Sequence, residues 1–185
     1  MEPSGLKRAF LAIVPPDEVL DAVDRLLDRP KRSIFKWTSR ERWHITLQFY
    51  GRVDDVATLS AGIRAATAAS PPARLVLRGG GAFPNPKKAQ VFWLGVDGTD
   101  ALLDLHARVA AETRDFIGRR DRIALRPHLT LAHLKRSVDL TEDVDALEGV
   151  PVGPPWMATE VLLLESRSRQ AASVYAEQDR FPLGG

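Results

Sequence analysis

Cysteine is absent from this chain of 185 residues, and its absence excludes disulfide bonds, thiolate catalysis and cysteine-ligated zinc or iron–sulfur sites. Long hydrophobic runs are absent as well, since none approaches the roughly 18 residues that a membrane-spanning helix needs. The apolar run at residues 9–14 is short and stops at two prolines, so we expect no signal peptide. These absences predict a cytoplasmic protein with no membrane association.

An excess of charge of one sign is also lacking. The chain has 26 lysines and arginines against 24 aspartates and glutamates, so no overall basic field marks a nucleic-acid-binding protein. No cluster of carboxylates suits a two-metal site, and we therefore expect neither a metal nor another cofactor. A chain of this length that is 44% hydrophobic can bury one core, and we expect a single domain over residues 1–185 that acts as a monomer.

What the sequence does contain is one tetrapeptide, His-x-Thr-Leu, that occurs twice, at residues 44–47 and 128–131. Both copies lie in short apolar runs with strand character, where side chains two residues apart leave the same face. His44 and Thr46 should therefore point together, as should His128 and Thr130, while Phe49 should point the other way, into a core. Two such strands could line two walls of one cleft with two imidazoles and two hydroxyl groups, a set that suits a phosphodiester.

Basic residues gather around both copies of the motif. Taken singly, each is the ordinary solvated charge of a loop, but their bunching favours a rim that attracts phosphate groups without reading base sequence. They are Arg29, Lys31, Arg32, Lys36, Arg40 and Arg42 before the first copy, Arg114, Arg119, Arg120, Arg122 and Arg126 before the second, and Lys135 and Arg136 after it.

Strand patterns alternate with amphipathic helix patterns along the chain, and this order predicts an α+β fold. The three glycines at residues 79–81 indicate a turn, and residues 149–155 indicate a loop. Strands are expected at residues 9–14, 35–37, 43–50, 75–78, 90–96, 127–132, 161–165 and 173–178, and helices at 17–27, 53–69, 101–116 and 140–147.

The duplicated motif resembles the signature of the two-histidine (2H) phosphoesterase superfamily, and within it the RNA 2',3'-cyclic phosphodiesterases, also called 2'-5' RNA ligases. The resemblance extends over nearly the whole chain, including residues 8–13, 43–51, 83–86, 91–96, 126–132, 163–166 and 181–183. It implies two pseudo-symmetric lobes, each an antiparallel sheet with helices on its outer face, and an active-site cleft between the lobes. One departure stands out, because the family often has arginine five residues after the second motif histidine, where this chain has His133.

The chemistry of a 2',3'-cyclic phosphate assigns roles to these residues. A water must lose a proton as it attacks phosphorus, and the departing ribose oxygen must gain one; two histidines can do both near neutral pH. Thr46 and Thr130 would donate hydrogen bonds to the non-bridging oxygens. The resemblance favours His44 as the general acid and His128 as the base. The expected reaction is metal-independent hydrolysis of cyclic phosphate ends of RNA, or of small cyclic nucleotides, to a 2'-phosphate, with 2'-5' ligation as the reverse.

Several alternatives remain open at the level of the sequence. His133 either contacts the substrate as a protonated ring or is structural, in which case Lys135 or Arg136 would bind the phosphate. Other residues, His106 and the aromatic residues Phe10, Trp37 and Tyr50, are expected to pack rather than to bind. The chain could also be a nucleotide- or RNA-binding module of the same fold with little turnover, although both motifs are intact.

Overall fold

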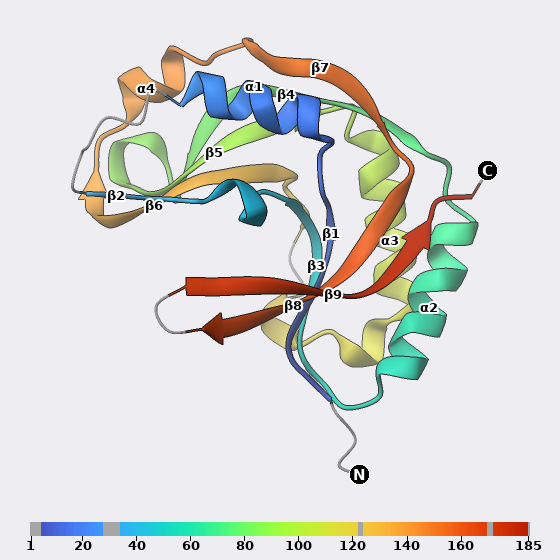
Figure 1. The fold of residues 1–185 in the computed structure, drawn as a ribbon. Helices are drawn as coiled ribbons and strands as arrows, with labels where there is room; N and C mark the ends of the chain where they lie inside the picture. The colour runs from blue at the N-terminus through green and yellow to red at the C-terminus, as the bar shows by residue number, and fades with distance from the viewer. Residues whose placement is uncertain (1–4, 28–33, 122–123, 170–171, 185) are drawn as a thin grey trace.

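Nine antiparallel strands form one curled sheet in the computed structural model, which describes residues 5–27, 34–121, 124–169 and 172–184 (Figure 1). The strands follow the order β7-β4-β5-β6-β3-β1-β8-β9, and β2 pairs with β6. The elements are β1 (Leu6–Ile13), α1 (Asp17–Leu26), β2 (Phe35–Trp37), η1 (Arg40–Arg42), β3 (Ile45–Val53), α2 (Val56–Ala68), β4 (Ala73–Phe83), η2 (Pro86–Lys88), β5 (Ala89–Asp97), α3 (Asp100–Glu112), η3 (Arg114–Phe116), η4 (Arg119–Asp121), β6 (His128–Val138), α4 (Thr141–Asp145), β7 (Pro151–Ala158), β8 (Glu160–Arg169) and β9 (Ala172–Pro182).

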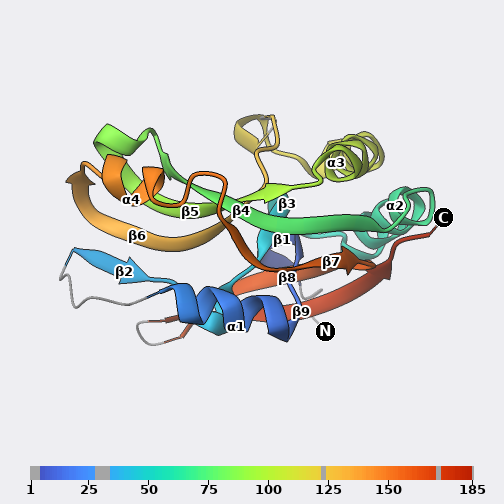
Figure 2. The same cartoon turned by 90° about the horizontal axis from the view of Figure 1, so that it is seen from above.

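The sheet has two halves, and each contains one copy of the motif. One half consists of β3, β1, β8 and β9, and the other of β7, β4, β5, β6 and β2. The halves meet where β3 pairs with β6, through Ile45 and Leu129. Seen from above, the two halves lie one over the other and separate away from this junction (Figure 2). The predicted α+β fold with two antiparallel halves is confirmed, and the two lobes share one continuous sheet.

The helices pack on the outside of the sheet. Helix α1 lies against the edge strand β7, and α2 and α3 lie side by side, against β9 and β3 respectively (Figures 1 and 2). The apolar sides of these elements form one core that runs through both halves, with Leu47, Leu94 and Leu129 almost completely buried. Burying these side chains against the helices leaves the opposite side of both motif strands free to line a cleft.

Two predicted irregular segments are strands instead. Gly79, Gly80 and Gly81 lie inside β4, where the register against β5 shifts between Leu77 and Gly80. Glycine is needed at position 81 because Trp93 of β5 covers it so closely that a Cβ atom would lie 2.1 Å from the Trp93 ring. A turn was the wrong prediction because the sequence pattern could not reveal this cross-strand contact.

Residues 149–155, predicted as a loop because of their glycines and prolines, include the start of β7 at Pro151. Within the described residues β7 is an edge strand that pairs only with β4, and prolines are tolerated where one side of a strand makes no ladder hydrogen bonds. Helix α4 is shorter than the predicted 140–147, and α3 ends at Glu112, after which residues 114–116 form a separate 3₁₀ turn.

Candidate active site

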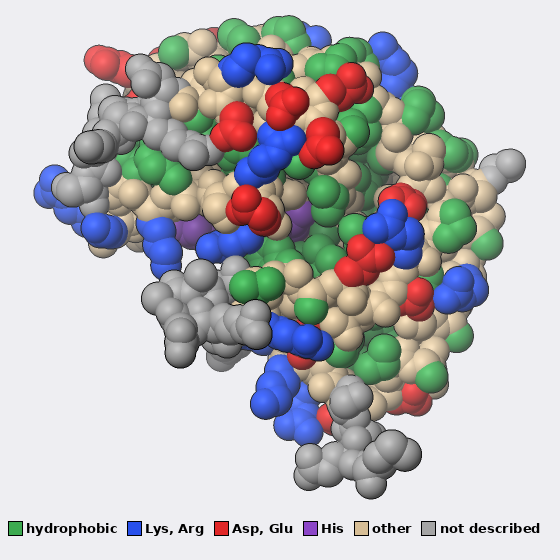
Figure 3. Space-filling model, viewed as in Figure 1, with side chains coloured by type: hydrophobic (Ala, Val, Ile, Leu, Met, Phe, Trp, Pro, Cys, Tyr) green, Lys and Arg blue, Asp and Glu red, His purple; other side chains and the backbone are tan. Residues whose placement is uncertain are grey.

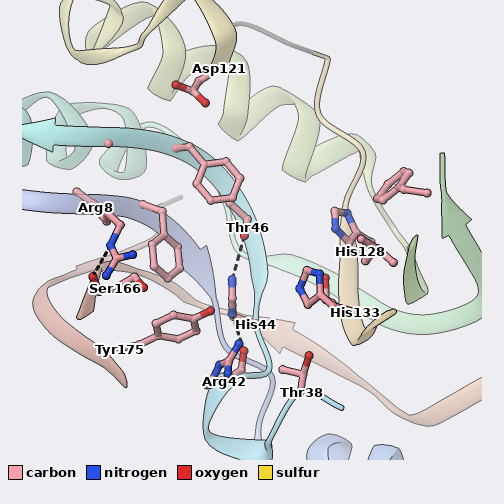
Figure 4. Close-up of a pocket in the computed structure, with 17 residues that line it drawn as sticks. Arg8, Thr38, Arg42, His44, Thr46, Asp121, His128, His133, Ser166 and Tyr175 are labelled. Carbon is pink, nitrogen blue, oxygen red and sulfur yellow. Dashed lines mark hydrogen bonds between the residues drawn. The ribbon is translucent and has the colours of Figure 1, made fainter. Parts of the chain in front are cut away.

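A cavity of about 540 Å³ opens between the two halves of the sheet, a volume suited to a nucleotide-sized ligand. All five side chains predicted to act in the site line it: His44, Thr46, His128, Thr130 and His133. In Figure 4, His44 and Thr46 on one wall face His128 and His133 on the other. Other lining residues include Arg8, Phe10, Thr38, Arg42, Phe49, Phe83, Ser166 and Tyr175.

The two motif strands repeat the same irregularity. In β3, Thr46 pairs with Ala12 of β1 and Gln48 pairs with Leu11. Leu47 therefore has no partner of its own and forms a β-bulge. In β6, Thr130 and Ala132 pair with consecutive residues of β5, so Leu131 is extra in the same way. The sequence of buried and less buried residues is accordingly the same in 44–49 as in 128–133, and the last residue of each segment, Phe49 or His133, is exposed.

The bulges decide which side chains reach the cavity. Strict alternation would put the fifth residue after each histidine on the opposite face, but one extra residue reverses the phase of the strand. His133 therefore lines the cavity together with His128. Phe49, predicted to point into the core, is 52% exposed and lines the cavity instead. That prediction was wrong because strand periodicity in a sequence does not reveal a bulge.

Both motif histidines are held by the same hydrogen bond. Nδ1 of His44 lies 2.7 Å from the carbonyl oxygen of Arg42, and Nδ1 of His128 lies 2.7 Å from that of Arg126. A carbonyl can only accept, so Nδ1 carries the hydrogen in both rings, and Nε2 is the atom available for proton transfer. Nε2 of His44 also lies 3.0 Å from the hydroxyl of Thr46, which joins the two polar residues of the motif (Figure 4).

Aromatic side chains enclose each histidine. The rings of Phe10 and Tyr175 lie 5.0 and 5.1 Å from that of His44, and Phe83 lies 5.0 Å from that of His128. Burial lowers the pKa of His44 to about 4, and the charges of His128 and Arg42 act in the same direction. Burial also lowers the pKa of His128, and the charge of Arg126 adds to it. Both rings are therefore neutral at pH 7 in the unliganded protein.

The neighbourhood of His133 does not favour a protonated ring. Its pKa is lowered first by partial desolvation at the cavity wall, and then by the positive charges of Arg42 and Lys36. Lys36 is its partner on β2, and Figure 4 shows the His133 ring beside that of His128, across the cavity from His44. A neutral imidazole is a weaker partner for phosphate than a guanidinium group.

The predicted basic rim is only partly present at the cavity. Arg40 lies in ion pairs with Asp17, Asp21 and Asp24 of α1, and so ties that helix to the segment before the first motif. Lys135 and Arg136 are exposed but do not line the cavity. Histidine side chains lie in a hollow of the surface in Figure 3, with lysine and arginine side chains beside it. Arg29, Lys31, Arg32 and Arg122 lie outside the described residues.

Three arginines make contacts near the site that the sequence did not predict, although Arg42 and Arg126 were expected in the basic rim. Arg8 lines the cavity and donates to the carbonyl of Ser166 at 3.2 Å. Arg42 and Arg126 each stand two residues before a motif histidine, and each guanidinium lies over an aromatic ring of that histidine's wall, at 5.9 Å from Tyr175 and 5.0 Å from Trp93. The signal was present, because the repeat extends to Arg-x-His-x-Thr-Leu in both halves.

The other candidates pack as expected, with one exception. His106 on α3 lies with Nδ1 3.0 Å from the carbonyl of Leu47, and Tyr50 is buried with its hydroxyl accepting from Thr113. Trp37 stacks on Phe35. Phe10 is buried, yet it also lines the cavity beside His44. Among the described residues, no group of three or more His, Asp or Glu side chains could hold a metal ion, and none of the helices is long and apolar enough to span a membrane.

Comparisons with known proteins identify a family and similar folds. The sequence profile of the 2'-5' RNA ligase superfamily matches residues 15–170. The RNA 2',3'-cyclic phosphodiesterase of Methanothermobacter thermautotrophicus is 32% identical, over 95% of this chain and 98% of its own length. That of Thermotoga maritima is 29% identical over 75% of this chain and 78% of its own. Among solved structures, TT0787 of Thermus thermophilus superposes with a TM-score of 0.81 at 26% identity, over 96% and 98% of the two chains. Apo LigT of E. coli gives 0.75 at 20% identity, over 98% and 100%.

Proposed function

The chain belongs to the 2'-5' RNA ligase superfamily of two-histidine phosphoesterases, and from this premise we propose that it hydrolyses the 2',3'-cyclic phosphate at the ends of RNA to a 2'-phosphomonoester. The observation that carries the proposal is the pair of motif histidines on opposite walls of one cavity, each with Nδ1 hydrogen-bonded to a backbone carbonyl and Nε2 left for chemistry. Relatives named for this activity cover most of the chain.

In the proposed reaction, His128 is the base and His44 the acid. His128 is the more exposed of the two, and solvent can deliver the attacking water to its Nε2. As the water oxygen bonds to phosphorus, its proton passes to His128. The bond from phosphorus to the ribose 3'-oxygen breaks, and that oxygen takes a proton from Nε2 of His44. Thr46 and Thr130 donate to the non-bridging oxygens, where negative charge persists through the transition state.

The lowered pKa values add a requirement to this scheme. Because both histidines are neutral in the free protein at pH 7, the proton on His44 must arrive with the substrate. An anionic phosphate between the rings raises the pKa of both, since it attracts the charged forms. The same steps with a 5'-hydroxyl in place of water as the nucleophile would join that hydroxyl to the cyclic end as a 2'-5' linkage.

Incubation with a dinucleotide that ends in a 2',3'-cyclic phosphate, in the presence of excess chelator, tests the proposal directly. We expect complete conversion to the 2'-phosphate, because no step of the proposed mechanism uses a metal. Chromatography against both monophosphate standards identifies the product. Turnover that disappears in chelator and returns with a divalent ion would contradict the mechanism. Binding without turnover would favour the second candidate, a nucleotide-binding module, for which the neutral His133 in place of arginine is the one observation in favour.

A further inference from the structure

The cavity must supply a positive charge for its substrate, and the source of that charge is not the residue that the family resemblance indicates. A phosphodiester is an anion, and the walls around the two motif histidines are largely aromatic. An anion in such surroundings needs charged or strongly polar donors. Position 133, where the family often has arginine, holds a histidine whose pKa is lowered.

Arginine at position 42 meets the requirement. Arg42 lines the cavity, and Figure 4 shows its side chain beside His44, with Tyr175 next to it. Its Nε atom is buried and has no hydrogen-bond partner among the described residues, so one donor remains to be satisfied. The charge of Arg42 lowers the pKa of both His44 and His133, which line opposite walls of the cavity, so the guanidinium is within electrostatic reach of both walls.

A second unsatisfied donor lies in the same segment. The Thr38 side chain is 5% exposed and lines the cavity, and its hydroxyl has no partner within the described part of the chain. Arg42 is the last residue of the short η1 turn and Thr38 lies two residues before the turn begins, and the Arg40 ion pairs tie this turn to α1. Buried donors without partners are rare in folded proteins, and two that line one cavity beside the motif histidines indicate a site for an anion.

We propose that Arg42, assisted by the hydroxyl of Thr38, is the phosphate-binding group of this chain, in the role that the resemblance gives to an arginine at position 133. The proposal rests on the proposed function only for the kind of phosphate ester bound. It also accounts for the histidine: two guanidinium groups facing one another in an aromatic cavity would repel, whereas a neutral His133 opposite Arg42 does not.

Substitution of Arg42 provides the test. Arg42→Gln should weaken binding of adenosine 2'-monophosphate, measured by calorimetry, by about 10- to 100-fold, the effect of losing a charged donor to phosphate. KM for the cyclic dinucleotide should rise with it. Arg42→Lys should retain part of the affinity, and Thr38→Val should lose less than Arg42→Gln. Lys135→Gln, which removes a cation that does not line the cavity, should leave the affinity within about threefold of the parent.

A second experiment tests whether an arginine at position 133 can replace the one at position 42. In the Arg42→Gln background, His133→Arg should restore at least half of the lost binding free energy, whereas in the parent it should help less, because the two guanidinium groups would repel. Thermal melting checks that each variant is folded. Arg42→Gln binding within threefold of the parent, a loss confined to Lys135→Gln, or no rescue by His133→Arg would each overturn the proposal. If the parent binds the monophosphate through Arg42 but does not hydrolyse the cyclic ester, this proposal stands and the proposed function fails.

Discussion

His44 and His128 are equivalent in their hydrogen bonding and unequal in their surroundings. Each ring presents Nε2 to the cavity through the same bond from Nδ1, but His44 is the more buried, and burial lowers its pKa to about 4. A neutral pair at pH 7 suits a site that acquires its proton only when an anion binds.

Removal of either imidazole should stop the chemistry. We expect His44→Ala and His128→Ala each to lower kcat by at least ~10²-fold, because a single general acid or base contributes roughly 10²–10⁴-fold. The double variant should lose little more, since both residues act in one displacement. Steady-state kinetics on the cyclic dinucleotide measure these losses. Losses that multiply in the double variant would argue against a shared step, and a single variant with parental activity would remove that residue from the mechanism.

The pH dependence of turnover should reveal the lowered pKa values. The pKa of each histidine lies below the ordinary 6.5. The fraction of free protein in which one of the two histidines is protonated therefore falls as the pH rises toward neutrality. The ratio kcat/KM, which reports the free protein, should peak below pH 6.5 and fall about tenfold per pH unit on the alkaline side. The profile of kcat should extend to higher pH, because bound phosphate raises both pKa values. A kcat/KM that is constant between pH 6 and 8 would refute this assignment.

At the scale of elements, the contact between β4 and β5 supports the second histidine. Gly81 faces Trp93 across the strand pair, and the Trp93 ring lies 5.8 Å from that of His128. The segment of glycines in β4 therefore has a structural task close to the site, although it takes no part in the chemistry.

A methyl group at this position should displace the tryptophan. Gly81→Ala should destabilise the protein by roughly 1–3 kcal/mol, the usual cost of overpacking, and lower kcat by moving the wall of His128. The matched control is Gly80→Ala, whose Cβ would meet only the side chain of Leu147, at 3.0 Å. Urea denaturation and kinetics on both variants test the point. Equal effects at the two positions would show that contact with Trp93 is not what requires glycine.

At the scale of the whole molecule, titration of the cavity histidine should appear in global stability. His44 has a folded pKa of about 4 against 6.5 in the unfolded chain, so the unfolded state binds more protons between these values. Stability is therefore fully present above pH 6.5 and is lost as pH falls toward 4, by up to ~1.4 kcal/mol per pH unit.

Urea titrations between pH 4.5 and 7.5 measure this slope. His128 and His133 add to it with the same sign, while Asp55 and Asp139, whose pKa values are lowered from 3.8, lose their contribution only at lower pH. His44→Gln removes one group that binds a proton in the unfolded state but not in the folded state. The slope of the unfolding free energy against pH should therefore decrease by the contribution of about one proton. A slope unchanged by this substitution would mean that His44 is protonated as easily in the folded protein as in the unfolded chain.

The sequence by itself determined the α+β class, the repeated His-x-Thr-Leu, and four of the polar side chains that line the cavity, because local alternation in a strand already requires His44 to point with Thr46 and His128 with Thr130. It also placed most strands and helices within a few residues of their observed bounds. These features depend on neighbours within a few positions along the chain.

Only the tertiary structure decided the rest, since the remaining features depend on contacts between strands that are distant in sequence. The bulges at Leu47 and Leu131 arise from pairing with β1 and β5, and they bring Phe49 and His133 to the cavity. Gly81 of β4 must be a glycine because Trp93 of β5 covers it. Arg42 was one of six basic residues predicted to form a rim before the first motif, and only the fold singles it out, because its Nε is buried beside the cavity histidines without a partner among the described residues. No spacing in the sequence specifies burial of that kind.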